Sequence, residues 1–298
     1  MVRVFIGVPV YNGEAYLADA LESLLAQTHR DWVALVADNA STDRTAEIAQ
    51  SFAARDPRVR YHRHERNLGA APNFNYCVAQ ASGSYFKWMA HDDKCLPTYL
   101  ERCIARLESD PGAVLCHARA KHIDGDDRIT GSYTREWNFN DPDPAARFAA
   151  AMALDHACVT VFGVMRLDVL RQTPAIAPFV GSDRSLLAEL ALHGRLEYVP
   201  EELFLWRDHP TRSVRLNRRQ RLTWFNANAR TVLSALLVRQ LLANQRAALR
   251  VPDTLGGRSA AFARTLRWAL WNWRPLAGDL RAIAGALVRS VVPMGRSA

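Results

Sequence analysis

Residues 2–14 read VRVFIGVPVYNGE, and this stretch decides the fold. The run from residue 2 to residue 10 is almost continuously apolar, which is typical of a strand buried on both faces of a sheet. Polar residues follow at once, beginning with Tyr11 and Asn12. A doubly buried strand that ends in a polar loop is typical of a parallel α/β sheet, in which ligands bind beyond the carboxyl ends of the strands.

Strand and helix patterns alternate outward from this segment through the first 120 residues. The expected strands are 2–10, 32–37, 59–62, 85–89 and 113–120, and the expected helices are 14–27, 42–54, 70–81 and 97–108. Ser41 is the expected N-cap of the second helix, and Pro97 stands in the first turn of the fourth. The alternation predicts an α/β fold with a mainly parallel sheet and helices on both faces.

The sequence beyond residue 120 is less regular. It indicates a turn at 124–127, a helix from 141 to 152, an amphipathic helix at 182–193, and short strands at 197–200 and 203–207. From residue 216 the pattern is helical, with expected breaks at 252–257 and at Pro275. We therefore expect a helical extension after the α/β domain.

Charge divides the chain at nearly the same point. Residues 215–298 contain 15 Arg, no Lys and two acids, a net charge of +13; because the whole chain carries +8, residues 1–214 carry −5. A basic, Trp-containing helical extension favours contact with an anionic membrane surface, or else a cap that packs on the domain with its Arg in solvent. Nucleic-acid binding is not expected, because no recognised binding motif accompanies the charge.

The five cysteines bear on the location of the protein. Their number is odd and no C-x-x-C spacing occurs, which indicates reduced thiols rather than disulfides or a zinc site. Neither a signal-peptide pattern nor an apolar stretch of about 18 residues is present. We expect a cytoplasmic protein, with any peripheral contact on the inner face of the membrane.

Four polar clusters follow four of the predicted strands. They are residues 9–14 (PVYNGE), 38–45 (DNASTDRT), 66–69 (RNLG) and 90–93 (AHDD). Because parallel strands end at the same edge of a sheet, we expect all four clusters to meet on one rim. A single polar loop would carry little information, but four at strand ends predict a binding site.

Acidic residues give this rim its chemistry. Asp92 and Asp93 are paired acids after an apolar strand, which suits a hard divalent cation that would neutralise a diphosphate. Taken alone, the pair is explained better by a turn before a helix, where Asp caps the N-terminus. Asp38 can accept a hydrogen bond from the N3–H of a pyrimidine, or the segment can serve only to cap a helix.

Two further motifs lie in the second half. Asp183 opens the helix at 182–193, where its carboxylate can act as a general base, although capping by Ser182 with an acid in the first turn explains the same pattern. His209, in the sequence RDHP at 207–210, can bind metal or phosphate or be structural.

Read in order, these motifs resemble the inverting GT-A-fold glycosyltransferases of family 2. The matching stretches are VPVYN (8–12), DNASTD (38–43), NLG (67–69), HDD (91–93) with Pro97, SD (182–183) before LLAEL, and RDHP (207–210). The resemblance covers roughly residues 3–213. It implies a GT-A, Rossmann-like domain at 1–213, with a nucleotide-binding half (1–120) and an acceptor-binding half (121–213), followed by the basic amphipathic extension at 214–298.

The resemblance also implies a role for each matching residue. The donor nucleotide would lie against Pro9, Tyr11, Asn12, Glu14, Asp38, Asn39, Asn67, Gly69 and Asp92. Asp38 would hold the uracil or thymine base. Asp92, Asp93 and His209 would hold Mn²⁺ or Mg²⁺, with Asp93 as the first choice for direct ligation, and Asp183 would be the catalytic base.

The implied activity is transfer of a hexosyl group from a UDP- or dTDP-sugar to a hydroxyl of a glycan or lipid-linked acceptor, with inversion. The chain departs from the family at Ala90, where many members have Asp, and at Ser182, where many have Glu. These departures leave room for an inactive nucleotide-sugar-binding scaffold at a membrane. A nucleotidyltransferase is a further alternative, but the loop at 11–14 lacks the Lys or Arg that would hold a triphosphate.

Overall fold

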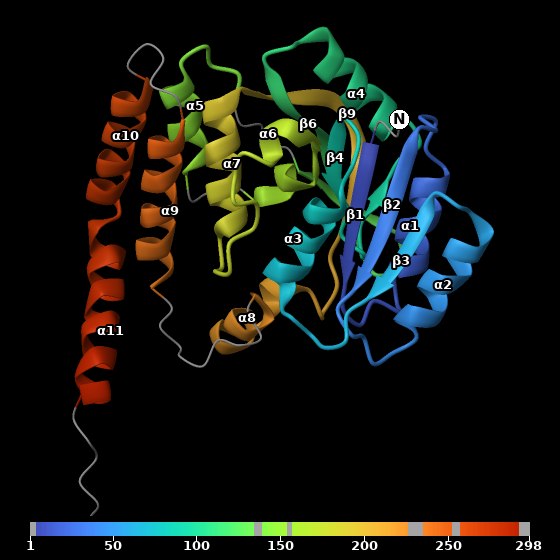
Figure 1. Ribbon diagram of the computed structural model, residues 1–298, viewed down its shortest axis with the longest axis horizontal. Helices are drawn as coiled ribbons and strands as arrows, with labels where there is room; N and C mark the ends of the chain where they lie inside the picture. Colours follow the sequence, from blue (N-terminus) through green and yellow to red (C-terminus); the bar gives the residue numbers. More distant parts are fainter. Residues whose placement is uncertain (1–3, 134–138, 154–156, 226–234, 252–256, 292–298) are drawn as a thin grey trace, which may run out of the picture.

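The computed structural model describes residues 4–133, 139–153, 157–225, 235–251 and 257–291. Within these residues the chain forms one nine-stranded sheet with the strand order β3-β2-β1-β4-β8-β6-β9-β5, and β7 pairs with β6 outside this path. Helices cover both faces of the sheet (Figure 1). The predicted α/β class is confirmed.

The first half of the sheet is parallel throughout. The strand β1 pairs with β2 and β4, and β2 pairs with β3. The elements of this half are β1 (Val4–Val10), α1 (Leu17–Leu25), β2 (Trp32–Asp38), α2 (Thr45–Arg55), β3 (Val59–Arg63), α3 (Ala70–Gln80), β4 (Tyr85–Trp88) and α4 (Tyr99–Ser109).

Every residue of β1 and β2 is buried, because α1, α2 and α4 pack on one face of the sheet and α3 packs on the other. The helix α3 approaches β1 so closely that a Cβ at Gly7 would lie 2.4 Å from the Cβ of Cys77. Only glycine fits at this position, which accounts for the single gap in the apolar run of β1.

The second half of the sheet is mixed. The strand β8 runs antiparallel between β4 and β6, and β9 is parallel to β6. The elements of this half are β5 (Lys94–Cys95), β6 (Ala113–Ile123), β7 (Ile129–Tyr133), α5 (Pro144–Ala151), η1 (Cys158–Phe162), β8 (Val164–Arg166), α6 (Leu167–Leu170), α7 (Ser182–His193), β9 (Arg195–Arg207) and η2 (Ser213–Arg215). The expected parallel order therefore ends at β8, a three-residue strand without a sequence signal of its own.

In the part of the chain that the structure describes, four helices follow the sheet domain: α8 (Arg218–Phe225), α9 (Leu236–Arg250), α10 (Gly257–Trp271) and α11 (Trp273–Val291). The helix α9 packs against α7 and α10 packs against α5, and α11 continues the line of α10 along the outer edge of the molecule, beside α9 (Figure 1). Trp268 is buried there and its indole Nε1 donates to the carbonyl of Met152 at 3.0 Å. The extension is therefore a packed layer, while the predicted boundary at residues 213 and 214 stays a prediction.

Two local predictions were wrong. Ser41 does not cap α2, which begins after Arg44 without a side-chain cap, because the Ser41 Oγ instead accepts the backbone N–H of Asn12 at 2.9 Å. The break predicted at Pro275 is found three residues earlier, at Asn272 between α10 and α11, so Pro275 lies in the first turn of the new helix, where proline is tolerated. The two short strands expected at 197–200 and 203–207 form one strand, β9. The break expected at 252–257 falls mostly outside the described residues.

The helix α7 has the predicted bounds but not the predicted amphipathic character. Its residues from Ser185 to Leu192 are all buried, including the polar side chains of Ser185 and Glu189. The cause is that α5, η1, β9 and α9 all pack on it. A helix buried on all sides has no solvent face to display.

Candidate active site

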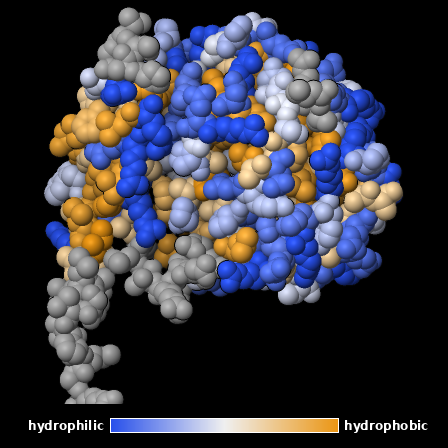
Figure 2. Space-filling model, in the orientation of Figure 1, coloured by the Kyte–Doolittle hydropathy of each residue, from blue (hydrophilic) through white to orange (hydrophobic). Residues whose placement is uncertain are grey.

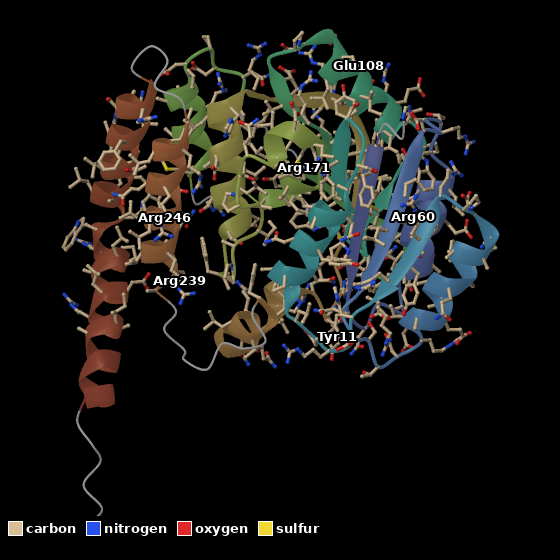
Figure 3. The ribbon with its side chains drawn as sticks, in the orientation of Figure 1. Tyr11, Arg60, Glu108, Arg171, Arg239 and Arg246 are labelled. Atoms are coloured by element: carbon tan, nitrogen blue, oxygen red, sulfur yellow. The ribbon has the colours of Figure 1, made fainter. Side chains whose placement is uncertain are left out.

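The predicted polar clusters do meet at one edge of the sheet. The strands β1, β2, β3 and β4 all end there, and Tyr11 lies at this edge, opposite Glu108 at the other (Figure 3). The helix α7 directly precedes β9 and runs antiparallel to it, so its first turn, with Asp183, also lies at the carboxyl edge.

Asp92 and His209 form a contact at this rim. The Nε2 of His209 lies 2.9 Å from the Oδ2 of Asp92, and its Nδ1 lies 2.9 Å from the Oγ1 of Thr211. Burial alone would raise the pKa of Asp92, but the charge of His91 and the hydrogen bond from His209 outweigh burial and hold the pKa at about 2. The carboxylate of Asp92 is therefore ionised at neutral pH.

Asp93 has a different environment. It is only 1% exposed, and its Oδ1 accepts the backbone N–H of Arg207 at 2.9 Å. Burial and the charge of Asp92 raise the pKa of Asp93 well above its ordinary value. Within the described residues no group of three or more His, Cys, Asp or Glu side chains is arranged to hold a metal. Asp92 and His209 are in contact, and Asp93 as a further metal ligand stays a prediction.

Arg207 ties these two acids to the rest of the rim. Its side chain is fully buried, its Nε donates to the carbonyl of Asp92 at 2.8 Å, and its Nη2 donates to Asp127 at 2.6 Å. Its guanidinium also donates to the carbonyl of Asp124 at 3.0 Å and lies 4.5 Å from the ring centre of Tyr16. Together with the bond from its backbone to Asp93, Arg207 holds the segment at 92–93 from two sides.

Two rim loops, at 11–14 and 39–45, are joined by hydrogen bonds. The Oδ1 of Asn12 accepts the N–H of Thr42 at 2.8 Å, and an Oε of Glu14 accepts the N–H of Arg44 at 3.1 Å. Asn12 and Ala40 both adopt positive φ values, 52° and 61°. Tyr11 is 40% exposed at the tip, whereas Pro9 is buried in β1. Asn12 and Glu14 therefore build the wall of the rim, and Tyr11 is available to a ligand.

Asp38 lies below these loops and is fully buried. Its Oδ1 accepts the N–H of Ser41 at 2.8 Å, and its Oδ2 accepts the hydroxyl of Tyr61 and the Nη1 of Arg63, both at 2.9 Å. Arg63, by contrast, is 43% exposed at its side chain. Protein donors already occupy both carboxylate oxygens, so a direct bond from Asp38 to a base stays a prediction.

Asn39 fixes the third cluster, the loop at 67–69. Its amide nitrogen donates to the Oδ1 of Asn67 at 2.9 Å and to the carbonyl of Gly69 at 3.2 Å, and its oxygen accepts the N–H of Leu68 at 2.8 Å. The side-chain amide of Asn39 thus holds the loop after β3 against the end of β2. This loop ends at Gly69, the N-cap of α3.

Asp183 lies in the first turn of α7 and is partly exposed. Gly181, with φ 88°, is the N-cap, so the alternative in which Ser182 caps the helix is wrong. The Oδ1 of Asp183 accepts the N–H of its neighbour Arg184 at 2.9 Å. Burial raises the pKa of the nearby Cys158 thiol well above its ordinary value, and the charge of Asp183 raises it further.

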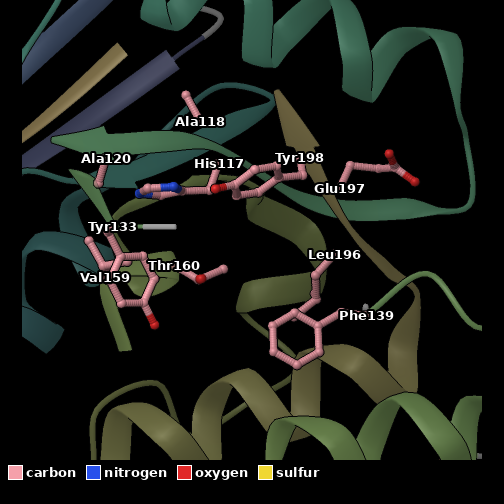
Figure 4. A pocket seen from close by; sticks show the side chains of 10 residues that line it. All are labelled: His117, Ala118, Ala120, Tyr133, Phe139, Val159, Thr160, Leu196, Glu197 and Tyr198. Atoms are coloured by element: carbon pink, nitrogen blue, oxygen red, sulfur yellow. The ribbon is translucent and has the colours of Figure 1, made fainter. Parts of the chain in front are cut away.

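A small cavity lies between β6, β9 and η1, below the rim. Its volume of about 20 Å³ is enough for a single water molecule. His117, Tyr133, Thr160 and Tyr198 line it with polar side chains (Figure 4). His117 is 1% exposed, and its Nε2 has no hydrogen-bond partner among the described residues.

Sequence reasoning gave no role to Arg207, Arg63 or Tyr61. Arg207 belongs to the motif RDHP, but nothing in the sequence distinguishes a buried arginine from an exposed one. Tyr61 and Arg63 alternate along β3, and that spacing of two was the only signal that both face Asp38.

Comparison with known proteins supports the resemblance to family 2 glycosyltransferases that the sequence motifs indicate. The model of "Glycosyl transferase family 2" matches residues 5–172. Putative glycosyltransferase EpsE of Bacillus subtilis is 35% identical over 107 residues, which is 36% of this chain and 38% of EpsE. Putative teichuronic acid biosynthesis glycosyltransferase TuaG of B. subtilis is 34% identical over 99 residues, 33% of this chain and 39% of TuaG. The chain thus spans less than two fifths of these curated relatives.

Solved structures share the fold at low sequence identity. TarS 1-349 of S. aureus in complex with UDP-GlcNAc has a TM-score of 0.57 and 16% identity, with 92% of each chain covered. The mannosyltransferase PcManGT of Pyrobaculum calidifontis, in complex with GDP-Man and Mn²⁺, has a TM-score of 0.53 and 18% identity, covering 95% of this chain and 86% of PcManGT. The fold is the predicted GT-A fold, and the chain belongs to glycosyl transferase family 2.

Proposed function

We propose that this chain transfers a sugar from a nucleoside-diphosphate donor to an acceptor hydroxyl, with inversion at the anomeric carbon. The observation that carries the proposal is the pairing of Asp92 with His209 at the rim where the donor clusters converge. A carboxylate beside an imidazole at the carboxyl edge of an α/β sheet suits a bound diphosphate with its cation.

The pair fits a divalent cation such as Mn²⁺ or Mg²⁺. Asp92 offers an ionised carboxylate and His209 an imidazole nitrogen, a set that Mn²⁺ accepts. The other ring nitrogen of His209 is held by Thr211, the usual arrangement for a metal-binding histidine. When bound, the cation would neutralise the diphosphate and favour its departure. Asp93, because of its bond to Arg207, would position Asp92 rather than bind the metal.

The base and ribose would occupy the rim between Tyr11 and the loop at 67–69. Tyr11 is exposed enough to stack on a base, and Arg63 offers a partly free guanidinium next to Asp38. Asp38 would then act by orienting Tyr61 and Arg63. UDP and dTDP sugars both remain within this proposal.

Asp183 would take the proton of the acceptor hydroxyl as its oxygen attacks the anomeric carbon. The bond from that carbon to the diphosphate breaks as the new glycosidic bond forms, and the nucleoside diphosphate leaves from the opposite face. A partly exposed carboxylate at a helix start is accessible to an acceptor, which supports this role. An α-linked donor would give a β-linked product.

We further propose a glycan or lipid-linked acceptor and an enzyme that works on the inner, cytoplasmic face of a membrane. The support is the cationic extension, together with the teichuronic acid biosynthesis named for the similar TuaG. No helix in the described part of the chain is both long enough and apolar enough to cross a bilayer.

Thermal unfolding with nucleotides tests the donor site. A ligand that binds the folded state raises the melting temperature by mass action. We expect UDP or dTDP with Mn²⁺ to raise it, GDP to raise it less, and Asp92→Asn to remove the metal-dependent part. Asp126→Asn, an exposed acid on the neighbouring turn, is the matched control.

The outcomes separate the candidates. If no nucleotide stabilises the protein, either with or without Mn²⁺, the proposed donor site is wrong. If nucleotide binds but no acceptor or water receives the sugar, and Asp183→Asn changes nothing, the chain is the inactive scaffold that Ala90 and Ser182 left open.

A further inference from the structure

The outer side of α10 and α11 is unusual because it exposes large apolar side chains. Leu270 is 72% exposed, Trp271 is 73% exposed and Trp273 is 59% exposed, and Leu266 and Leu280 are about half exposed. Figure 2 shows this hydrophobic surface over α10 and the start of α11, beside a hydrophilic column over α9. A surface helix normally turns such residues inward, so this exposure needs a partner.

These residues lie on one stripe. The N–H of Asn272 donates to the carbonyl of Trp268, and the N–H of Leu276 donates to that of Asn272, both at 3.0 Å, which carries helical spacing from α10 into α11. Positions 266, 270, 273 and 280 are then separated by four, three and seven residues and share a face. Leu266, Leu270, Trp273 and Leu280, with Trp271 beside them, form what we call the docking face.

Arginines border the docking face at every second turn. Arg267, Arg274 and Arg281 are seven residues apart and directly follow Leu266, Trp273 and Leu280. The guanidinium of Arg267 lies 4.6 Å from the ring centre of Trp271, and that of Arg274 lies 5.5 Å from the ring of Trp273. Each of these two tryptophan rings therefore has a guanidinium group over it.

Few acids offset this charge. Asp279 is the one acidic residue in the described ranges 235–251 and 257–291. Its Oδ2 accepts the N–H groups of Leu237 and Val238 at 2.8 and 3.4 Å and so caps α9. From the sheet domain, a carboxylate oxygen of Asp143 lies 4.0 Å from the guanidinium of Arg264. The outer layer thus carries an excess of positive charge.

A groove opens beside this face, between α5 and α10. It has a volume of about 240 Å³ and is lined by Ala149, Met152, Arg264, Arg267, Trp268 and Trp271. Two arginines at the rim of a partly apolar groove suit a phosphate that carries an apolar chain.

We infer that the docking face binds the surface of a bilayer containing anionic phospholipid, with the leucines and tryptophans at the acyl boundary and the arginines at the phosphates. The inference gives a face and a lipid class to the proposed membrane location and rests on it. It is independent of the donor chemistry. A second copy of the chain fits less well, because a twofold contact would set Arg267, Arg274 and Arg281 against themselves.

The face is rigidly joined to the proposed catalytic half. Arg250 of α9 makes a two-point ion pair with the buried Glu189 of α7, with both bonds at 2.7 Å. The helix α7 carries Asp183 in its first turn. Docking through α10 and α11 would therefore hold Asp183 in a fixed orientation relative to the bilayer, which suits an acceptor that is itself membrane-anchored.

Flotation of the full chain with vesicles tests the inference. The vesicles are phosphatidylcholine alone, or an equal mixture with phosphatidylglycerol, at low and high salt. We expect binding only with phosphatidylglycerol, and weaker binding at high salt. Arg267→Gln with Arg274→Gln and Arg281→Gln should lower the partition coefficient about 100-fold. Leu270→Ser with Trp271→Ser and Trp273→Ser should lower it at least about tenfold.

Two exposed residues on the sheet domain supply controls. Ile129→Ser removes an apolar side chain that is 62% exposed on β7, and Arg128→Gln removes an exposed cation. Both variants should float like the wild type. Nucleotide-induced stabilisation should be unchanged in every variant, which separates a failure of docking from a failure of the donor site.

Three results would overturn the inference. They are absence of binding to anionic vesicles, binding that ignores lipid charge, and binding that the docking-face variants leave intact. A dimer in light scattering that the Leu270 and Trp271 substitutions dissociate would assign the face to self-association instead.

Discussion

The imidazole of His209 and the carboxylate of Asp92 lie 2.9 Å apart although 117 positions separate them in the chain. They meet because β9 runs parallel to β6 and pairs with β5, which delivers its end to the segment after β4. Asp93, the immediate neighbour of Asp92, is buried against the backbone of Arg207 instead. One step along the chain thus separates the proposed metal ligand from a residue that positions it.

Asp92→Asn and Asp93→Asn should therefore differ. Asp92→Asn removes the charge that faces His209, and we expect Mn²⁺-dependent stabilisation by nucleotide to fall at least about tenfold in apparent affinity. Asp93→Asn retains an oxygen that can accept the Arg207 N–H, so metal-dependent binding should persist. Titration of Mn²⁺ against the melting temperature at fixed nucleotide measures both.

If Asp93→Asn weakens Mn²⁺-dependent binding more than Asp92→Asn does, Asp93 is the direct ligand, as the sequence analysis predicted. Melting temperatures without ligand are the control, because a variant that has lost its fold cannot report on metal binding.

The polar rim could be predicted from the sequence. Which of its residues are accessible to a ligand, and which are held by other side chains, could not be predicted. The apolar run of β1 and the polar residues after it required only the period of a buried strand. Which of two adjacent acids faces solvent depends on Arg207, more than 100 positions away. The environment of Asp38 could not be predicted either, because its partners Tyr61 and Arg63 come from another strand.

The second half of the fold was less predictable for a related reason. The strand β8 has three residues, too few for a periodic pattern. The bounds of α7 followed from its sequence, but its burial did not, since Glu189 is paired with Arg250 from the extension. Burial of a polar residue depends on its partner, and the partner is set by tertiary structure.

Arg207→Met should reduce both stability and metal-dependent binding. The substitution removes the bonds to the Asp92 and Asp124 carbonyls and to Asp127. Asp127 keeps its bond from Lys94 and the Asp124 carbonyl keeps the bond from the Asp127 N–H, so the buried Asp92 carbonyl is the group that loses its side-chain donor. We expect a loss of about 3 kcal/mol in the free energy of unfolding. Denaturant titration measures this loss. Arg128→Met, at an exposed ion pair, should change it by less than about 0.5 kcal/mol.

Should Arg207→Met bind Mn²⁺ and nucleotide with unchanged affinity, Arg207 would be structural only. Arg207→Lys refines this test, since it keeps the charge but loses the planar fork that reaches several oxygens at once. Partial rescue of binding by lysine would indicate that charge contributes, and no rescue would indicate that geometry does.

His117→Phe should reduce the acid sensitivity of the fold. Burial, with a further contribution from the charge of Lys87, lowers the pKa of His117 from 6.5 to about 3. Between these values the unfolded chain binds a proton that the native protein does not, so the free energy of unfolding falls as pH falls through 6.5. At about pH 5 this costs about 2 kcal/mol.

Phenylalanine keeps a planar aromatic ring and cannot be protonated, so the variant should lose less stability than the wild type between neutral and mildly acidic pH. Denaturant titration across that range measures the difference. Parallel curves for the two proteins would mean that His117 does not titrate as described.

The ion pair between Glu189 and Arg250 should couple the extension to the sheet domain. The side chain of Glu189 is only 3% exposed, whereas that of Arg250 is 40% exposed. Arg250→Ala would leave a buried carboxylate without its partner, and we expect a loss of about 2 kcal/mol, since solvent screens the exposed arginine. Glu189→Gln with Arg250→Ala should recover part of it, because the uncompensated charge is gone. The coupling energy from this double-mutant cycle, measured by denaturant titration, is the test. A coupling energy near zero would mean that α9 is held by its apolar contacts alone. Loss of the ion pair would then leave the orientation of α7, and the position of Asp183 on it, unchanged.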